Sequence, residues 1–208
     1  MSLTNKQNEP SENLSIYTEE EEFFDYIHNL EVDRIKEMLN KNPLPIWDYK
    51  SKENQNSTVL NISVYKKSLE ITQILINYCK DNNPEQLKEF INTSNDQGVT
   101  PLHYASFRGE VPIIKLLVEN GADITKITNR QLNVIHYSAQ GNKPNVLIYF
   151  YLLLKENKDM ENKYNMILEK DSGGSTCLHW AVYSLAEDYL LFLLNLDIFD
   201  SVFEKKSL

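Results

Sequence analysis

A motif that recurs along the chain constrains its fold more than any other feature of the sequence. The segment from Gly98 to Ala105 reads Gly-Val-Thr-Pro-Leu-His-Tyr-Ala, and a related segment begins at Asn133, 33 positions after Thr100. A third copy begins at Thr176, 43 positions further on, which is one period plus a ten-residue insertion. Self-similarity at this period indicates short units that bury their apolar faces against one another. We therefore predict a solenoid whose exposed surface carries the function.

The copy at residues 96–128 contains the signals for two consecutive helices. Thr100 is a preferred N-cap residue, and Pro101 suits the first helical position. Gly109 and Gly121 are placed to end the first and the second helix, since glycine readily takes the left-handed conformation that follows a helix. This pattern resembles the ankyrin-repeat family. The resemblance implies an all-α fold, an ankyrin-repeat solenoid of about five helix-loop-helix units.

The resemblance covers residues 21–197, between a predicted disordered leader at 1–20 and a C-terminal tail at 198–208. Units are expected near residues 21–50, 54–80, 96–128, 129–154 and 171–197, with insertions at 81–95 and 155–170. In the first insertion, Pro84 precedes an apolar pattern that predicts a short added helix. Lys67 and Gln131 stand where glycines are expected, so the helix before Lys67 is expected to end by another route or to run on slightly.

Three histidines recur at one position of the repeat: His103, His136 and His179. The resemblance implies that each one hydrogen-bonds the turn that links adjacent units. Metal ligands must converge within a few ångströms, whereas equivalent positions of stacked units lie about 10 Å apart, so we predict no metal site. Cys177 and His179 are the only close nucleophile and base, but residues two apart on a helix point to different sides. We predict no catalytic site and no cofactor.

Aromatic residues recur at two positions of the first helix of each unit. One set is Tyr65, Phe107 and Tyr183, late in the helix, and the other is Tyr104, Tyr137 and Trp180, one turn earlier. In the ankyrin family this helix lines a concave face that binds proteins, and aromatic and arginine side chains commonly anchor interfaces. The implied partner-binding residues are Tyr65, Tyr104, Phe107, Arg108, Tyr137, Gln140, Trp180 and Tyr183. Packing between units is an equally good interpretation for Tyr104, Tyr137 and Trp180, whereas exposure is favoured for the other set.

Charge and composition limit the partners and the location. The formal net charge of -9, without a cluster of basic residues in the sequence, argues against nucleic acid as the main partner. The only two cysteines are Cys79 and Cys177, which fit reduced thiols rather than a disulfide framework. The longest apolar run, at residues 146–154, is too short to span a bilayer. We expect a cytoplasmic chain that does not itself insert into a membrane.

Two segments suggest a closer resemblance. Residues 138–150 and 177–183 resemble the ankyrin regions that precede the catalytic membrane domain of Asp-His-His-Cys palmitoyltransferases. That resemblance implies an alternative in which this chain recruits substrate proteins at the cytosolic face of an endomembrane, for a catalytic domain that the chain lacks. The first hypothesis is a non-enzymatic module that binds a protein partner, and a third is a stand-alone adaptor or inhibitor.

The end of the solenoid is expected to be incompletely capped. The residues after Asp197 are too few to build a polar capping repeat, which a solenoid needs for solubility. An uncovered apolar end favours association, so a weak dimer through the C-terminal repeat is expected.

Overall fold

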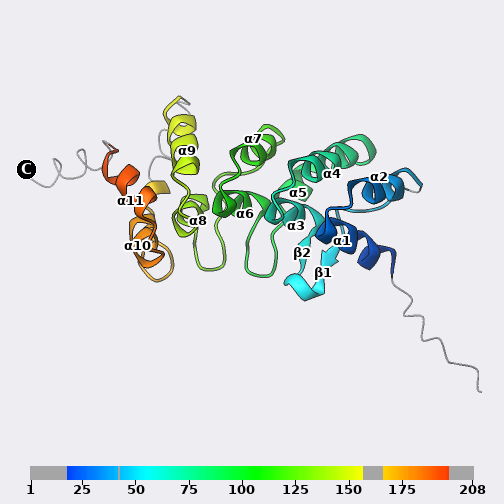
Figure 1. Ribbon diagram of the computed structural model, residues 1–208, viewed down its shortest axis with the longest axis horizontal. Coiled ribbons are helices and arrows are strands. Elements are labelled where there is room, and N and C mark those ends of the chain that lie inside the picture. The colour runs from blue at the N-terminus through cyan, green and yellow to red at the C-terminus, as the bar shows by residue number, and fades with distance from the viewer. Residues whose placement is uncertain (1–17, 42, 157–165, 197–208) are drawn as a thin grey trace, which may run out of the picture.

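The helices form one row in chain order. The computed structural model describes residues 18–41, 43–156 and 166–196. The predicted tail, most of the predicted leader and much of the second insertion lie outside these ranges. Within them the chain has eleven α-helices and two strands of two residues each. Figure 1 shows the helices side by side from α1 to α11, with the loops between units projecting along one edge. The all-α solenoid predicted from the repeat is confirmed.

Ten of the helices form five pairs. In chain order the pairs are α1 (Glu19–Asn29) with α2 (Val32–Lys41), α3 (Val59–Tyr65) with α4 (Leu69–Asn82), α6 (Pro101–Arg108) with α7 (Val111–Glu119), α8 (Val134–Gln140) with α9 (Pro144–Glu156), and α10 (Cys177–Tyr183) with α11 (Glu187–Leu194). We call the first member of each pair the inner helix and the second the outer helix. Inner helices from α3 to α10 pack against one another in sequence order, and α4, α7, α9 and α11 do the same.

The inner helices α3, α6 and α8 are largely buried because each lies between two other inner helices and packs against its outer helix. In α3 every residue from Val59 to Val64 is buried, and only Tyr65 at the end of the helix is exposed. The apolar side chains form one core that runs along the row. Exposed positions on α3, α6 and α8 are therefore few, and the more accessible ones lie mainly near the carboxyl ends of these helices.

Each inner helix is joined to its outer helix through a residue with left-handed backbone. These residues are Leu30, Lys67, Gly109, Asn142 and Leu185, with φ between +53° and +80°. Lys67, at φ +62°, takes the conformation of the expected glycine directly. The expectation that α3 would end by another route or run on is therefore wrong. Gln131 likewise takes φ +59°, close to the conformation of Gly98 in the preceding unit.

The insertions and loops contribute to the core. The short helix predicted in the first insertion is confirmed as α5 (Leu87–Asn92), which buries Phe90 and Ile91 against the row. In the described end of the second insertion, Met166 and Ile167 are buried. A small antiparallel ladder between β1 (Lys50–Ser51) and β2 (Ser57–Thr58) precedes α3. The helical periodicity did not predict this ladder.

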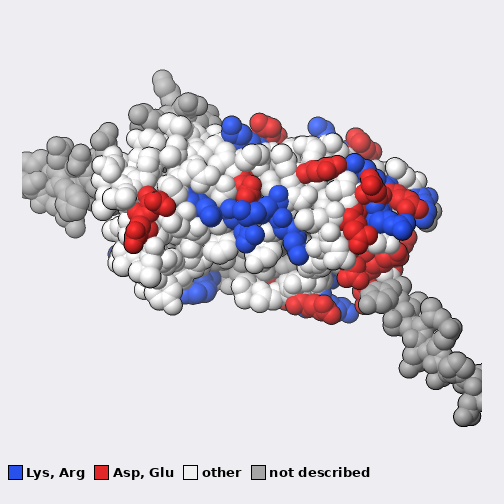
Figure 2. Space-filling view, viewed as in Figure 1, with Lys and Arg blue, Asp and Glu red and all other residues white. Residues whose placement is uncertain are grey.

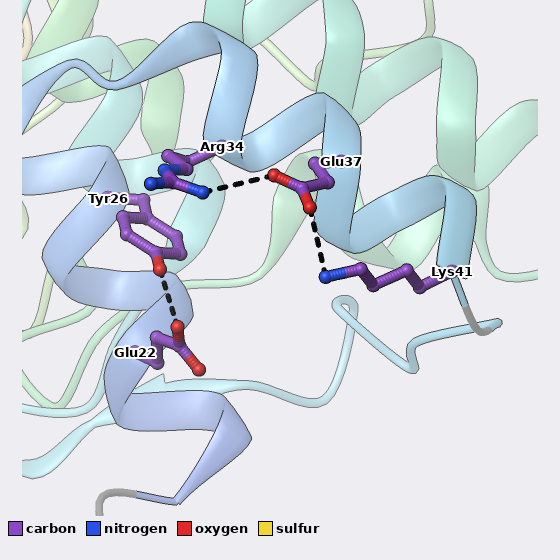
Figure 3. A network of polar contacts seen from close by, with 5 residues as sticks. All are labelled: Glu22, Tyr26, Arg34, Glu37 and Lys41. Atoms are coloured by element: carbon purple, nitrogen blue, oxygen red, sulfur yellow. Dashed lines mark hydrogen bonds and ion pairs between the residues drawn. The ribbon is translucent and has the colours of Figure 1, made fainter.

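The first pair carries its charges on the solvent side. Thr18 and Glu21 form a capping box at the start of α1. On α2, Glu37 pairs with Arg34 at 3.2 Å and with Lys41 at 3.0 Å, and Tyr26 donates a hydrogen bond to Glu22 on α1 (Figure 3). Because the charged side chains are exposed, water screens these contacts and each adds little to the stability of the fold. The network keeps this end of the row polar.

Candidate functional site

Buried histidines fix each unit on the next. The ring of His103 hydrogen-bonds Thr100 within its own unit, with 2.8 Å between Oγ1 and Nδ1. Its Nε2 lies 3.2 Å from the carbonyl oxygen of Leu132 in the following unit. His136 makes the equivalent contact at 3.3 Å to the carbonyl oxygen of Ser175. The turn-linking role implied for these two histidines is confirmed.

The same contact is modified at the second unit and at the last one. Asn61 stands at the histidine position of α3, and its Nδ2 donates to the carbonyl oxygen of Val99 at 3.2 Å. His179 keeps the bond to Thr176, but its ring is exposed. Burial lowers the pKa of His103 to about 4 and also lowers the pKa of His136, so both rings are neutral at neutral pH. Among the described residues, no cluster of three potential metal ligands is found.

Two tyrosines and an arginine from consecutive units form a cluster near the N-terminal end of the row. The rings of Tyr65 and Tyr104 meet edge to face with 5.5 Å between centroids. The guanidinium carbon of Arg108 lies 4.9 Å from the centroid of Tyr65, a cation–π distance. Asn95 donates from Nδ2 to the Tyr104 hydroxyl at 3.2 Å. Tyr65 and Tyr104 line a groove of about 430 Å³, which we call the first groove, together with His28, Asn54, Ile62 and Lys66.

A second cluster of aromatic and arginine side chains lies near the C-terminal end of the row. Trp180 and Tyr183 stack edge to face at 5.9 Å, and the guanidinium carbon of Arg130 lies 5.4 Å from the Trp180 ring. Trp180 donates from Nε1 to Asp171 at 2.9 Å. These four residues line a groove of about 490 Å³, the second groove, with Ser175 and His179.

Hydrogen bonds keep Asp171 ionised in the second groove. Burial would raise the pKa of Asp171, but hydrogen bonds from Ser175, Trp180 and Gly173 outweigh burial and lower it. The carboxylate therefore holds both the Gly173–Ser175 turn and the indole in place. This fixes one wall of the second groove.

The other expected site residues lie between the grooves. Tyr137 stacks edge to face on His103 at 5.0 Å, and burial raises the pKa of its hydroxyl to about 12, so packing between units is its principal observed role. Gln140, Phe107 and Arg108 line a depression of about 310 Å³ with Lys67, Gly141 and Lys143. Phe107 is half-buried, in contrast to Tyr65 and Tyr183, which expose 44% and 83% of their surfaces.

The expected residues thus do not form one continuous site. Tyr65 and Tyr104 line the first groove, with Arg108 stacked on Tyr65 from the neighbouring depression, while Trp180 and Tyr183 line the second groove. Sequence reasoning missed Arg130, which precedes α8 and reaches the tryptophan of the following unit. Arg130 stands outside the repeated helical positions, so periodicity offered no signal for it. The binding role of the whole set stays a prediction.

Comparison with known proteins agrees with this architecture. Residues 27–128 match the family described as ankyrin repeats, in three copies. Together with the stacked helix pairs, this match shows that the chain is an ankyrin-repeat protein.

Three relatives share parts of the repeat region. The chain is 33% identical over 108 residues to Palmitoyltransferase akr1 of Schizosaccharomyces pombe, an alignment that covers 52% of this chain and 15% of that protein. It is 43% identical over 42 residues to E3 ubiquitin-protein ligase XBAT32 of Arabidopsis thaliana, covering 20% of this chain and 8% of the ligase. An ankyrin repeat protein of Rickettsia bellii is 38% identical over 66 residues, covering 32% of this chain and 38% of the relative. The chain therefore matches less than half the length of each relative.

Proposed function

We propose that this chain is a protein-binding module that holds an extended segment of a partner polypeptide along the exposed ends of its inner helices. The observation that carries the proposal is the pair of aromatic and arginine clusters, one beside the first groove and one in the second. Interfaces are anchored by such side chains when they sit in preformed pockets. On this proposal the chain catalyses no reaction, and the partner meets it in the cytoplasm.

The clusters are suited to binding because their side chains are held before a partner arrives. Tyr65 is fixed between Tyr104 and Arg108, and Trp180 is fixed between Arg130 and Asp171. A preorganised surface loses less side-chain entropy on association than a mobile one. Tyr183, exposed and stacked on Trp180, is the best single anchor in the second groove.

The proposal is tested with peptides selected from a random display library against the full chain. Combined Tyr65→Ala and Tyr183→Ala substitutions are expected to weaken binding of the selected peptides at least tenfold, about 1.4 kcal/mol. The thermal unfolding curve should change little because both side chains are exposed. Leu152→Ala is the matched control, since Leu152 is 48% exposed on the outer helix α9. Equal weakening by the control, or selected peptides that bind the double variant normally, would contradict the proposal.

A second candidate is a substrate-recruiting region of a membrane-bound palmitoyltransferase. The favouring observation is the 33% identity to Palmitoyltransferase akr1 over half of this chain. No helix in the described part of the chain is long and apolar enough to cross a membrane. Reading the gene beyond the codon for Leu208 tests this candidate. A Cys-rich Asp-His-His-Cys segment with hydrophobic spans of about 20 residues would support it, and a stop codon there would favour an adaptor or inhibitor.

We also propose weak pairing with a second copy through the last helix pair. Val182, Leu185, Leu191 and Leu194 are all more than half exposed at this end. Exposed apolar side chains on one helix pair are best covered by a complementary surface, and a two-fold pair offers the same surface twice. Sedimentation at rising concentration should show a dimer that Leu191→Glu abolishes. A strictly monomeric profile at high concentration would contradict this pairing.

A further inference from the structure

Basic side chains gather at the middle of a strongly acidic molecule. The carboxyl end of α6 and the turns that follow α3 and α8 carry Lys66, Lys67, Arg108 and Lys143, which we call the basic strip. Figure 2 shows basic side chains running across the centre of the visible face, while acidic side chains gather at the end formed by α1 and α2. The formal net charge of the chain is -9. The local charge therefore has the opposite sign to that of the molecule.

Packing holds the strip together across three units. Nζ of Lys67 lies 2.8 Å from Oε1 of Glu110 in the next unit. The stem of Lys143 lies against Gly109, since a Cβ added at Gly109 would come within 2.5 Å of the Lys143 Cδ. Lys67, Arg108 and Lys143 line the same depression of about 310 Å³. The charges are thus placed side by side by the stacking of the turns.

Little in the fold neutralises these charges. Within the described ranges, Glu110 is the only carboxylate that forms an ion pair with a member of the strip. The guanidinium of Arg108 rests on the Tyr65 ring, and its Nε is buried without a hydrogen-bond partner. A cation held by a ring keeps its charge available to an incoming anion. A carboxylate lies near each end of the strip without forming an ion pair with it: Glu53 lines the first groove with Lys66, and Asp188, at the start of α11, accepts a hydrogen bond from Asn142, which precedes Lys143.

We propose that the basic strip selects an acidic segment of the partner polypeptide, laid across units two to four beside the first groove. This inference rests on the proposed function, because it names the chemistry of the segment that the module binds. Three stacked units span about 30 Å, so an extended segment of roughly ten residues reaches across them. Its carboxylates pair with the strip while its apolar side chains contact Tyr65 and Tyr104. Complementary charge mainly sets specificity and association rate.

The test uses two fluorescein-labelled peptides of roughly ten residues, one alternating Glu with Leu and the other alternating Gln with Leu. We expect the full chain to bind the Glu peptide at least tenfold more tightly than the Gln peptide, by fluorescence anisotropy at low salt. Arg108→Gln with Lys143→Gln should remove this preference. Lys88→Gln with Lys115→Gln is the matched control, because it removes the same charge from exposed positions on α5 and α7.

Each outcome bears on a defined part of the proposal. The acidic-segment inference is overturned if the Gln peptide binds equally well, if the strip variant keeps the preference, or if the Glu peptide does not bind at all. The proposed function still stands in those cases if Tyr65→Ala with Tyr183→Ala weakens the display-selected peptides. Salt-sensitive self-association that the strip variant abolishes would assign the strip to a second copy and overturn the inference. A single Lys143→Gln variant keeps the test valid if the double variant unfolds.

Discussion

At the scale of single residues, the repeat contains larger residues at turn positions whose left-handed backbone glycine would adopt with less strain. Leu185 and Gln131 both have positive φ, and both are exposed, with Leu185 82% accessible. A residue with a Cβ is destabilised by about 1–2 kcal/mol in the left-handed backbone region, and glycine removes this strain. Glycine also makes the unfolded chain more flexible, which cancels part of the gain in stability. Leu185→Gly and Gln131→Gly are therefore each expected to stabilise the fold by about 0.5–1 kcal/mol in urea denaturation. Gly109→Ala, at φ +80°, should destabilise it, and a destabilised Leu185→Gly would contradict the argument.

The buried histidines make stability depend on pH. Burial lowers the pKa of His103 to about 4 in the folded state, against about 6.5 in the unfolded chain. Between these values the unfolded chain binds the extra proton, so stability is complete above pH 6.5 and is lost as the pH falls towards 4. The loss is about 3 kcal/mol for this group, and His136 adds to it in the same direction.

Asn61 suggests a variant that isolates the contribution of His103 to the pH dependence of stability. An asparagine at the same position already donates to the next unit through Nδ2. His103→Asn should therefore keep the link between units but flatten the dependence of unfolding free energy on pH between 4 and 6.5, measured by urea denaturation. Parallel curves for the variant and the natural chain would show that His103 does not titrate as described. The comparison removes the contribution of carboxylates, which both proteins share.

At the scale of elements, the first insertion is structural. Phe90 on α5 is almost completely buried, while Lys88 on the same helix is exposed. Phe90→Ala should cost about 3–4 kcal/mol because it leaves a cavity, whereas Lys88→Ala should be nearly neutral in the same denaturation experiment. If both variants unfold at the same urea concentration, α5 is a surface loop rather than part of the core.

The helices and strands also differ in how well the local sequence predicts them. Pro84 and the apolar residues after it were enough to predict α5, because a local pattern specifies a helix. The small ladder of β1 and β2 was not predicted, since two-residue strands have no period of their own. Lys67 was misjudged for a different reason. Lys67 has a left-handed conformation that residues with a Cβ disfavour, in a turn closed by the hydrogen bond from the Ser68 N–H to the Ser63 carbonyl oxygen.

At the scale of the whole molecule, the helix pairs differ in how many other pairs they contact. The last pair packs on α8 and α9 and buries Ala181, Tyr189 and Leu193, while Leu191 and Leu194 of α11 are exposed. Because stability in a solenoid is a sum over units and their interfaces, a pair that contacts one other pair among the described residues should open more easily than a pair that contacts two. We expect amides of α10 and α11 to exchange with solvent faster than those of α6 and α8 in hydrogen-exchange measurements at low protein concentration. Equal protection along the row would show that it unfolds as one unit.

The period of the sequence was sufficient for the class of fold, the helix pairs of the matching units and the linking role of the histidines, because these depend on contacts that repeat in every unit. The candidate site was recovered only in part. Arg108 and Tyr65 are 43 positions apart, and Arg130 and Trp180 are 50 apart, so their meeting depends on how far one unit is offset from the next. Stacking determines that offset. Only the tertiary structure could therefore separate the two grooves and align the basic turns between them.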